Sequence, residues 1–379
     1  MKMIGKLWKD EGFRKAIYIF IIAKMLVISV GYAGYFLVPA EDSSRKQITG
    51  VLMNPWAQYD GRAYLDVAQN GYNSAFNGIG NYGWYPLYPA LIKIFSFAGY
   101  DTAAFLLSNV FSFLAVVMLY LIVKEEFGDI ARKTVTYFVL FPTAYFLSVM
   151  YAESLFIFLS VATFYYARKG NWLAAGVAGF FASLTRLQGL LLFLPIAYIY
   201  LDRIKFNYRK IKIDSLLTLL IPAGAAAFAV YLYFITGDAF VGSKVFAAQG
   251  KHFAMPWATF YTEAVNFFSA EVLKSKIYIL FNTIIALSLI VACIVSRKYL
   301  RKDYVIYLVT STLLPLFSGN LEAISRYALT IFPLFILVPL LEKNKKFSLL
   351  MKILLVISIV LLIVLTVRHV NMHLDNYGL

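Results

Sequence analysis

Two aspartates lie in one of the few polar stretches of this chain, and a carboxylate can exchange protons with a substrate. They belong to WAQYDGRAYLDVAQNGY, residues 56–72. Helical spacing would place Asp60, Tyr64 and Val67 on one face of a short helix and Asp66 elsewhere, so the two acids need not act as a pair. Asp60 is therefore a candidate for acid–base chemistry. The simpler alternative is an N-cap, because an aspartate before a helical run accepts hydrogen bonds from free amide groups.

Aromatic side chains crowd the same region of the sequence. An aromatic belt at the membrane interface explains some of them, and a surface that stacks on sugar rings explains them equally well. The segment NYGWYPLYPALIKIF also has two prolines that frame aromatic residues, which excludes a regular membrane span and favours a re-entrant or interfacial turn. The aromatic residues are Tyr59, Tyr64, Tyr72, Phe76, Tyr82, Trp84, Tyr85 and Tyr88.

Three charged residues interrupt or border apolar runs further along the chain. Glu153, in MYAESLFIF, is equally well explained as a carboxylate at a helix start and as a site residue. Arg186 and Arg326 stand in FFASLTRLQGLLLF and SGNLEAISRYALTIFP. Arginines can snorkel to lipid headgroups. Since both arginines are expected on the side of the membrane that carries fewer basic residues, we favour anion binding, because a guanidinium matches the geometry of phosphate.

Metal and thiol chemistry have little support in the sequence. His369 and His373 are four residues apart in RHVNMHLDN, with Asp375 nearby, which is a weak metal signal; an outer tail is the simpler explanation. Cys293 is the one cysteine and is expected to be a small core residue. No cofactor is therefore assigned, and a divalent metal is possible but not indicated.

The elements that must position these residues are transmembrane helices. The chain has 379 residues, of which only 15% are charged and 61% hydrophobic, and its mean hydropathy is +0.72; a soluble domain carries roughly a quarter charged residues. This composition predicts an all-α polytopic membrane protein of about eleven spans. The predicted spans are 17–38, 102–123, 134–149, 153–167, 172–184, 188–201, 215–235, 277–296, 304–318, 327–341 and 349–367.

The basic residues predict an orientation for the bundle. The net charge of +15 fits the positive-inside rule better than a nucleic-acid partner. Most of the 35 lysines and arginines fall in connections on the N-terminal side, which places the N-terminus in the cytoplasm and the C-terminus outside. One membrane domain, 1–379, would then present two long connections outward, 39–101 and 236–276. The first span is expected to be retained.

Five motifs in order resemble the PIG-V type of GPI mannosyltransferases, a branch of the membrane-embedded GT-C glycosyltransferases. Tyr59 stands where that family usually has Trp, and Ala152 where it has Thr. The compact, lysine- and isoleucine-rich chain is most similar to a prokaryotic relative, in the plasma membrane. The motifs are YDGRAYLDVAQNGY (59–72), WYPLYP (84–89), YAESLF (151–156), TRLQG (185–189), and Arg326–Tyr327 followed by Phe332–Pro333.

The resemblance implies a GT-C-type bundle that transfers a hexose, mannose in the first place, from a polyprenyl-phosphate sugar to a lipid-linked or glycan acceptor at the outer membrane face. Asp60 would be the general base of one inverting displacement, while Asp66 supports the loop. Arg186 and Arg326, with Tyr327, would hold the donor phosphate. The substrate-binding residues would be Tyr59, Tyr64, Trp84, Tyr85, Glu153, Gln188 and Glu322.

Two other classes of protein stay open. A multi-span transporter or lipid flippase also carries charges within the membrane, although such proteins often contain inverted repeats and this chain has none that is evident. A structural membrane scaffold would not require the ordered motifs. The expected partners are the donor, the acceptor and membrane lipids, with no nucleic acid. An enzyme predicts that Asp60, Glu153, Arg186 and Arg326 lie together.

Overall fold

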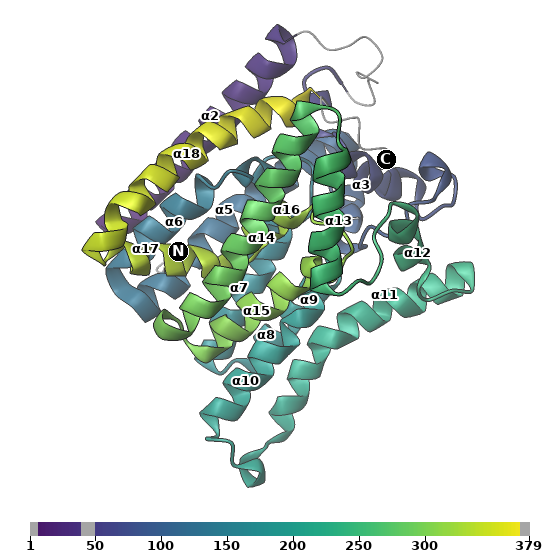
Figure 1. Cartoon of the computed structure of the whole chain (residues 1–379). Coiled ribbons are helices and arrows are strands. Elements are labelled where there is room, and N and C mark those ends of the chain that lie inside the picture. Colours follow the sequence, from purple (N-terminus) through teal and green to yellow (C-terminus); the bar gives the residue numbers. More distant parts are fainter. Residues whose placement is uncertain (1–6, 39–49, 372–379) are drawn as a thin grey trace.

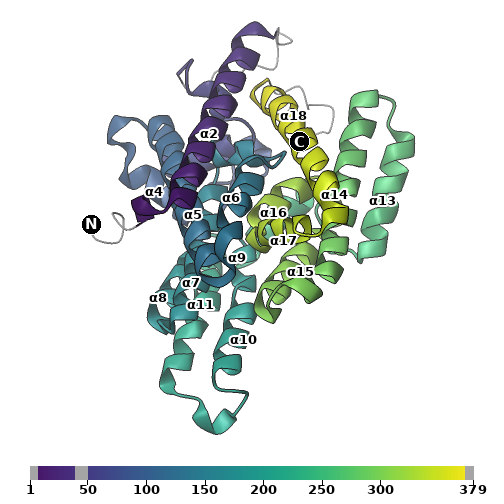
Figure 2. The same ribbon diagram turned by 90° about the vertical axis from the view of Figure 1, so that its left-hand side faces the viewer.

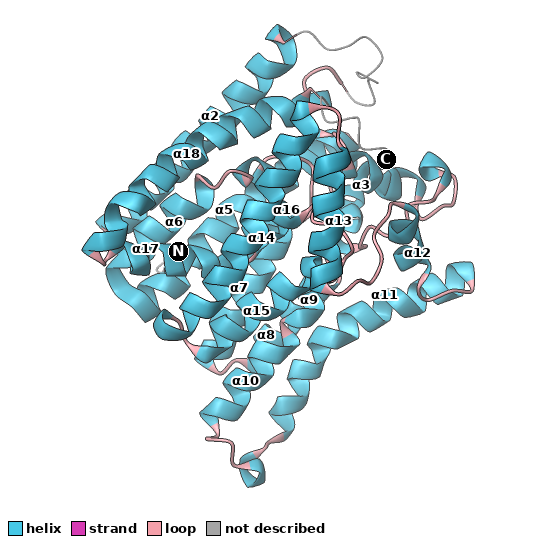
Figure 3. Ribbon diagram, in the orientation of Figure 1, coloured by secondary structure: helices cyan, strands magenta, loops and turns pink. Residues whose placement is uncertain are grey.

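Helices make up every regular element of the residues that this computed structural model describes, 7–38 and 50–371 (Figure 3). The all-α prediction is therefore confirmed for these residues. The helices are α2 (Glu11–Leu37), α3 (Asp60–Asn70), α4 (Leu87–Ile94), α5 (Tyr100–Phe127), α6 (Ala131–Val139), α7 (Glu153–Lys169), α8 (Trp172–Ser183), α9 (Gln188–Leu191), α10 (Phe193–Arg203), α11 (Leu220–Thr236), α12 (Val241–Ala248), α13 (Pro256–Ser269), α14 (Leu273–Tyr299), α15 (Lys302–Leu316), α16 (Ile324–Thr330), α17 (Phe332–Glu342) and α18 (Lys345–Val370).

Five helical segments are long and apolar enough to cross a membrane, or six if α16 and α17, which are bent by 77°, form one broken span. Such segments indicate an integral membrane protein. The prediction of about eleven spans is wrong. The five segments are Glu11–Leu37, Tyr100–Val139, Ile213–Thr236, Leu273–Tyr299 and Lys345–Val370.

The overcount arose because an apolar run records burial against other helices as well as exposure to lipid. Helix α7 has 17 residues, about 25 Å at 1.5 Å per residue, which falls short of a hydrocarbon core of about 30 Å. Most of its residues are buried inside the bundle. Other predicted spans are shorter still or broken: α8 has 12 residues, and 188–201 divides into α9 and α10.

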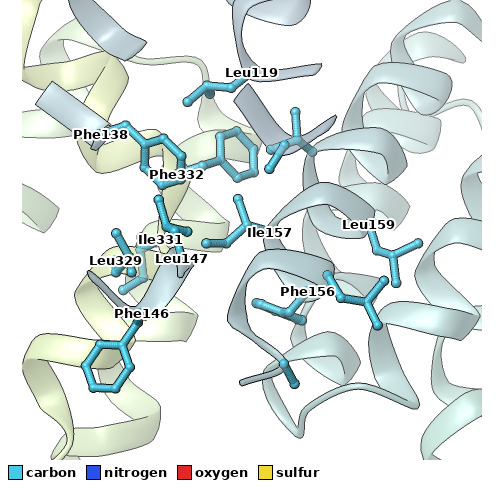
Figure 4. Packing of buried hydrophobic residues seen from close by; sticks show 14 of the residues in the cluster. Leu119, Phe138, Phe146, Leu147, Phe156, Ile157, Leu159, Leu329, Ile331 and Phe332 are labelled. Carbon is cyan, nitrogen blue, oxygen red and sulfur yellow. The ribbon is translucent and has the colours of Figure 1, made fainter. Parts of the chain in front are cut away.

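The core lies where α5, α6, α7 and α17 meet. Figure 4 shows Leu119 of α5, Phe138 of α6, Ile157 of α7 and Phe332 of α17 gathered in it, and all four are fully buried. Burying a large apolar side chain stabilises a fold by roughly 1.5–3 kcal/mol in water. This packing holds α7 at the centre of the molecule, so the two ends of α7 are well fixed.

The two ends of the bundle differ in character. Helix α7 runs from Glu153 to Lys169, and α2 and α18 lie side by side along one edge (Figures 1 and 2). At one end, ion pairs join the C-terminal ends of α5, α7 and α17 to neighbouring helices. These pairs are Lys124–Asp10 at 3.5 Å, Lys133–Glu342 at 3.0 Å and Arg168–Glu126 at 2.9 Å. At the opposite end, the C-terminal ends of α2 and α18 meet, and the Asn371 amide donates to the Gly34 carbonyl at 2.9 Å.

The two long connections lie at this second end and contain short helices. The described part of 39–101 forms α3 and α4, and 236–276 includes α12 and α13. The proline-rich segment forms a turn followed by the eight-residue α4, so it is not a regular span, as predicted. A ring contact between Trp84 and Phe246, with centroids 5.9 Å apart, joins the two connections.

Candidate functional site

Four charged residues that are far apart in the sequence form one continuous chain of ion pairs. Arg326 bonds through Nη1 to Oδ2 of Asp60, and its Nε lies 3.4 Å from Oε1 of Glu153. Arg186 bonds through Nη1 to the same Glu153 oxygen. The order is therefore Asp60, Arg326, Glu153, Arg186. The two carboxylates and two guanidinium groups of these ion pairs together carry no net formal charge.

The chain of ion pairs is accessible at its Asp60 end. The exposed fraction of the side chain is 28% for Asp60, 17% for Arg326, 10% for Arg186 and zero for Glu153. Burial raises the pKa of Asp60, but the charge and hydrogen bond of Arg326 outweigh it, and the pKa lies below its ordinary value. Asp60 is thus an ionised carboxylate whose basicity Arg326 suppresses. A ligand would meet Asp60 and Arg326 first.

The backbone that carries Asp60 is held in a strained turn. Helix α3 begins at Asp60, and its N-cap is Tyr59, with φ at 50°. A non-glycine residue in this region costs roughly 1–3 kcal/mol, and such residues cluster at functional sites. The Asp60 amide donates to the Tyr151 hydroxyl at 3.2 Å, which donates in turn to the Gln58 carbonyl at 3.1 Å. Since α3 has no side-chain cap, the N-cap interpretation of Asp60 does not match the structure.

Arg186 is positioned by a close approach between α8 and α9. A Cβ on Gly189 would lie 2.3 Å from the Ala182 backbone, so this turn requires glycine. The Arg186 guanidinium lies over the Tyr327 ring, 5.4 Å from its centroid. Gln188 is buried, and its Oε1 accepts from Thr330 at 3.0 Å.

Several buried polar atoms in or beside the ion pairs have no hydrogen-bond partner among the residues described. They include Nε2 of Gln188, Oε2 of Glu153 and Nε of Arg326. An unsatisfied buried polar atom costs about 1–3 kcal/mol. Native proteins keep such atoms mostly where water, a ligand or a function accounts for them. Their position supports the interpretation of this region as a functional site.

Aromatic rings form one wall of the site. The Arg326 guanidinium lies over Phe146 and Tyr151, 5.8 and 5.7 Å from their centroids. The His369 ring contacts the same two residues, each at 5.8 Å, and Tyr59 at 5.4 Å. His369 is buried in the last turn of α18. The prediction that it belongs to an outer tail is therefore wrong.

The spacing of His369 and His373 suggested a metal site, and the described part of the chain does not support one. No group of three or more His, Cys, Asp or Glu residues there could hold a metal ion. His373 and Asp375, which completed the weak sequence signal, lie outside the described residues. The buried His369 instead packs against aromatic rings.

The remaining predicted substrate residues lie at different distances from the ion pairs. Tyr64 is buried, with its ring 5.2 Å from that of Tyr88. The Tyr64 ring also lies 6.4 Å from that of Tyr151, which belongs to the aromatic wall of the site. Tyr85 packs on Phe228 of α11 at 4.9 Å.

Trp84 and Glu322 have contacts outside the chain of ion pairs. Trp84 packs against Phe246 of the second connection. The Glu322 carbonyl accepts from the Tyr278 hydroxyl at 2.6 Å. Among the described residues, neither side chain makes an ion pair or hydrogen bond with Asp60, Glu153, Arg186 or Arg326.

Asp66 organises the loop that follows α3. Its carboxylate accepts from the side-chain amides of Asn70 at 2.7 Å, Asn73 at 3.1 Å and Asn81 at 2.6 Å. These contacts tie the end of α3 to the aromatic segment beyond it. The arrangement agrees with the expectation that Asp66 supports the loop.

Two lysines near the site were not selected from the sequence. Lys251 lowers the pKa of Asp60 by its charge, and its loop is tied down by the Ala254 amide, which donates to the Phe317 carbonyl at 3.0 Å. Lys24 of α2 donates to Asn109 and Ser148, each at 3.0 Å, and so holds the segment before Glu153. A lysine in the middle of an apolar helix is itself a functional signal, which could have identified Lys24.

The chain has no match among family models or curated proteins. Its functional interpretation consequently depends on the ion-paired residues and on the ordered motifs that contain them. Each of the four ion-paired residues belongs to a different one of those motifs.

Proposed function

We propose that this protein is an inverting glycosyltransferase that moves a hexose, most simply mannose, from a polyprenyl-phosphate sugar to a lipid-linked or glycan acceptor. The observation that carries the proposal is the convergence of Asp60, Glu153, Arg186 and Arg326. The resemblance of five ordered motifs to PIG-V-type enzymes supports the choice of reaction. The chain would belong to a prokaryotic branch with a GT-C-like bundle.

Asp60 would act as the general base. The acceptor hydroxyl gives its proton to the Asp60 carboxylate while its oxygen attacks the anomeric carbon of the donor sugar. The bond from that carbon to the phosphate oxygen breaks, and polyprenyl phosphate leaves with the electron pair. No acid is needed, because the phosphate leaves ionised and Arg326 stabilises its growing charge. A positioned base contributes typically about 10² to 10⁴ in rate.

The charge balance of the site implies an order of events. Both arginines are already paired with carboxylates, so a donor phosphate must compete for them. Arg326 is the more exposed arginine and contacts Asp60, which is the more exposed of the two carboxylates. The phosphate would therefore take Arg326 from Asp60. Loss of that contact raises the basicity of Asp60, so the base becomes active only when a donor is bound.

The direction in which the site faces follows from the charge bias. The site lies at the end of α7 opposite to Arg168 and Lys169. If the basic end is cytoplasmic, as the positive-inside rule predicts, the sugar is transferred at the outer membrane face. Donors carried on a lipid suit this location, because their tails can remain among the helices while the phosphate reaches Arg326.

The proposal is tested by incubating purified protein with polyprenyl-phosphate mannose and a membrane lipid extract. Mass analysis should find products heavier than an acceptor by one hexose, together with free polyprenyl phosphate. A matched reaction with Asp60→Asn should form both at least about a hundredfold more slowly. If wild type leaves the donor intact with every lipid fraction and also fails to bind it, the proposed donor class is wrong.

A further inference from the structure

The connection between α10 and α11 gathers five cations around a hollow of about 390 Å³. It forms the hairpin tip at the bottom of Figures 1 and 2, between the ends of α10 and α11. The Ile213–Thr236 span starts directly after it, so the hollow lies at the membrane boundary. The cations that line it are Arg203, Lys205, Arg209, Lys210 and Lys212.

The backbone is folded so that two basic runs face the same hollow. Lys205 and Phe206 have consecutive positive φ angles of 53° and 54°, a conformation that is unfavourable for residues other than glycine. The Lys212 amide donates to the Tyr200 hydroxyl at 3.0 Å, which donates to Asp214 at 3.1 Å. Asp214 is therefore hydrogen-bonded to Tyr200. The turn brings the basic side chains together although its backbone conformation is unfavourable.

These five cations have no ion-pair partner in the described part of the chain. Elsewhere at the basic end, Lys124, Lys133 and Arg168 are each paired with an acid. All five side chains are exposed. Like charges held close together repel one another, and an anion in the hollow would offset that repulsion. Lysine and arginine together favour phosphate oxygens as the ligand.

Apolar side chains beside the hollow indicate which phosphate it takes. Ile213 is 85% exposed and Tyr208 73% exposed, and Phe206, Ile211 and Leu216 are also exposed. Water-exposed groups of this size are costly in bulk solvent but fit among the acyl chains and headgroups of a bilayer. A free phosphate would make no use of them. We infer that the 203–212 connection binds the headgroup phosphate of an anionic phospholipid.

This inference does not depend on sugar transfer, because the hollow and the ion-paired site lie at opposite ends of the bundle. Every basic residue near an anionic surface adds a similar attraction, so a merely diffuse effect would be the same wherever the charges lie at that end of the bundle. A built site requires the charges around the hollow. The test therefore compares two variants that each lose three exposed charges at the basic end of the bundle.

The measurement is the Kd of a fluorescent short-chain phosphatidylglycerol for the full chain in detergent, with phosphatidylcholine of the same chains for comparison. The variant R209Q/K210Q/K212Q should weaken phosphatidylglycerol binding at least tenfold. The control K343Q/K345Q/K346Q removes three exposed charges, from Lys343 just after α17 and from Lys345 and Lys346 at the start of α18, and should change that Kd less than twofold. Equal melting temperatures would show that both variants fold.

Two outcomes would overturn the assignment. Equal weakening by both variants would mean diffuse attraction with no site. Binding of inorganic phosphate or pyrophosphate alone, at concentrations that displace phosphatidylglycerol, would identify a free phosphate as the ligand. The wild-type protein should bind phosphatidylglycerol more tightly than phosphatidylcholine. Loss of this preference in R209Q/K210Q/K212Q alone supports the lipid site.

Discussion

Replacing Asp60 by asparagine should make the protein bind its donor more tightly while it loses turnover. In the free protein, Arg326 is engaged by Asp60, so a donor phosphate must first displace the carboxylate. A hydrogen bond to a charged group contributes about 1.5–3 kcal/mol. Because Asp60 and Arg326 are partly exposed, the competing contact is worth about 1–2 kcal/mol. Removing that competition should lower the donor Kd about 5- to 30-fold.

The assay is equilibrium binding of polyprenyl-phosphate mannose without any acceptor. Arg326 should stay oriented in the variant, because Glu153 remains 3.4 Å from its Nε. Asp66→Asn is the matched control, because it removes the same charge from the same helix. Among the described residues, the Asp66 carboxylate contacts asparagines and no arginine, so this variant should leave the donor Kd unchanged. A donor Kd that is unchanged or higher in Asp60→Asn would refute the competition between carboxylate and phosphate.

Three further predictions concern orientation, backbone packing and phosphate recognition. Cysteines placed at the exposed positions Asn77 and Ser243 should react with a membrane-impermeant reagent from outside intact cells; labelling only from the cytoplasmic side would reverse the topology. Gly189→Ala should lower the melting temperature strongly, because its Cβ would lie 2.3 Å from backbone, whereas Gly61→Ala, with its nearest contact at 3.5 Å, should be mild; similar melting temperatures would contradict this packing. Arg326→Lys keeps the charge but loses the planar fork, so donor affinity should fall at least about tenfold, and wild-type affinity would remove Arg326 from the phosphate site.

The charged members of the site could be selected from the sequence, because a charge beside an apolar run is costly and therefore informative. Asp60, Glu153, Arg186 and Arg326 each stand out in this way. Their pairing could not be selected, since Asp60 and Arg326 are separated by 266 positions. Only the packing of α3, α7 and α16 at one end of the bundle brings them together.

The number of spans and the aromatic wall of the site could not be predicted from the sequence, for a different reason. Hydropathy does not distinguish a helix in contact with lipid from one buried among other helices, and α7 belongs to the second kind. The predicted last span, 349–367, ends before His369, which leaves that residue in a tail. In the structure α18 continues to Val370 and carries His369 into the rings of Tyr59 and Tyr151.

The central claim is that Asp60 takes the proton of the acceptor, and single-turnover transfer of mannose from donor-saturated protein tests it most directly. Donor saturation removes any difference in donor affinity, so the rate reports chemistry alone. The account predicts that Asp60→Asn slows this step at least about a hundredfold, while Asp66→Asn stays within a few-fold of wild type. Near-normal transfer by Asp60→Asn, or a larger loss in Asp66→Asn, would contradict it and make Glu153 the next candidate for the base.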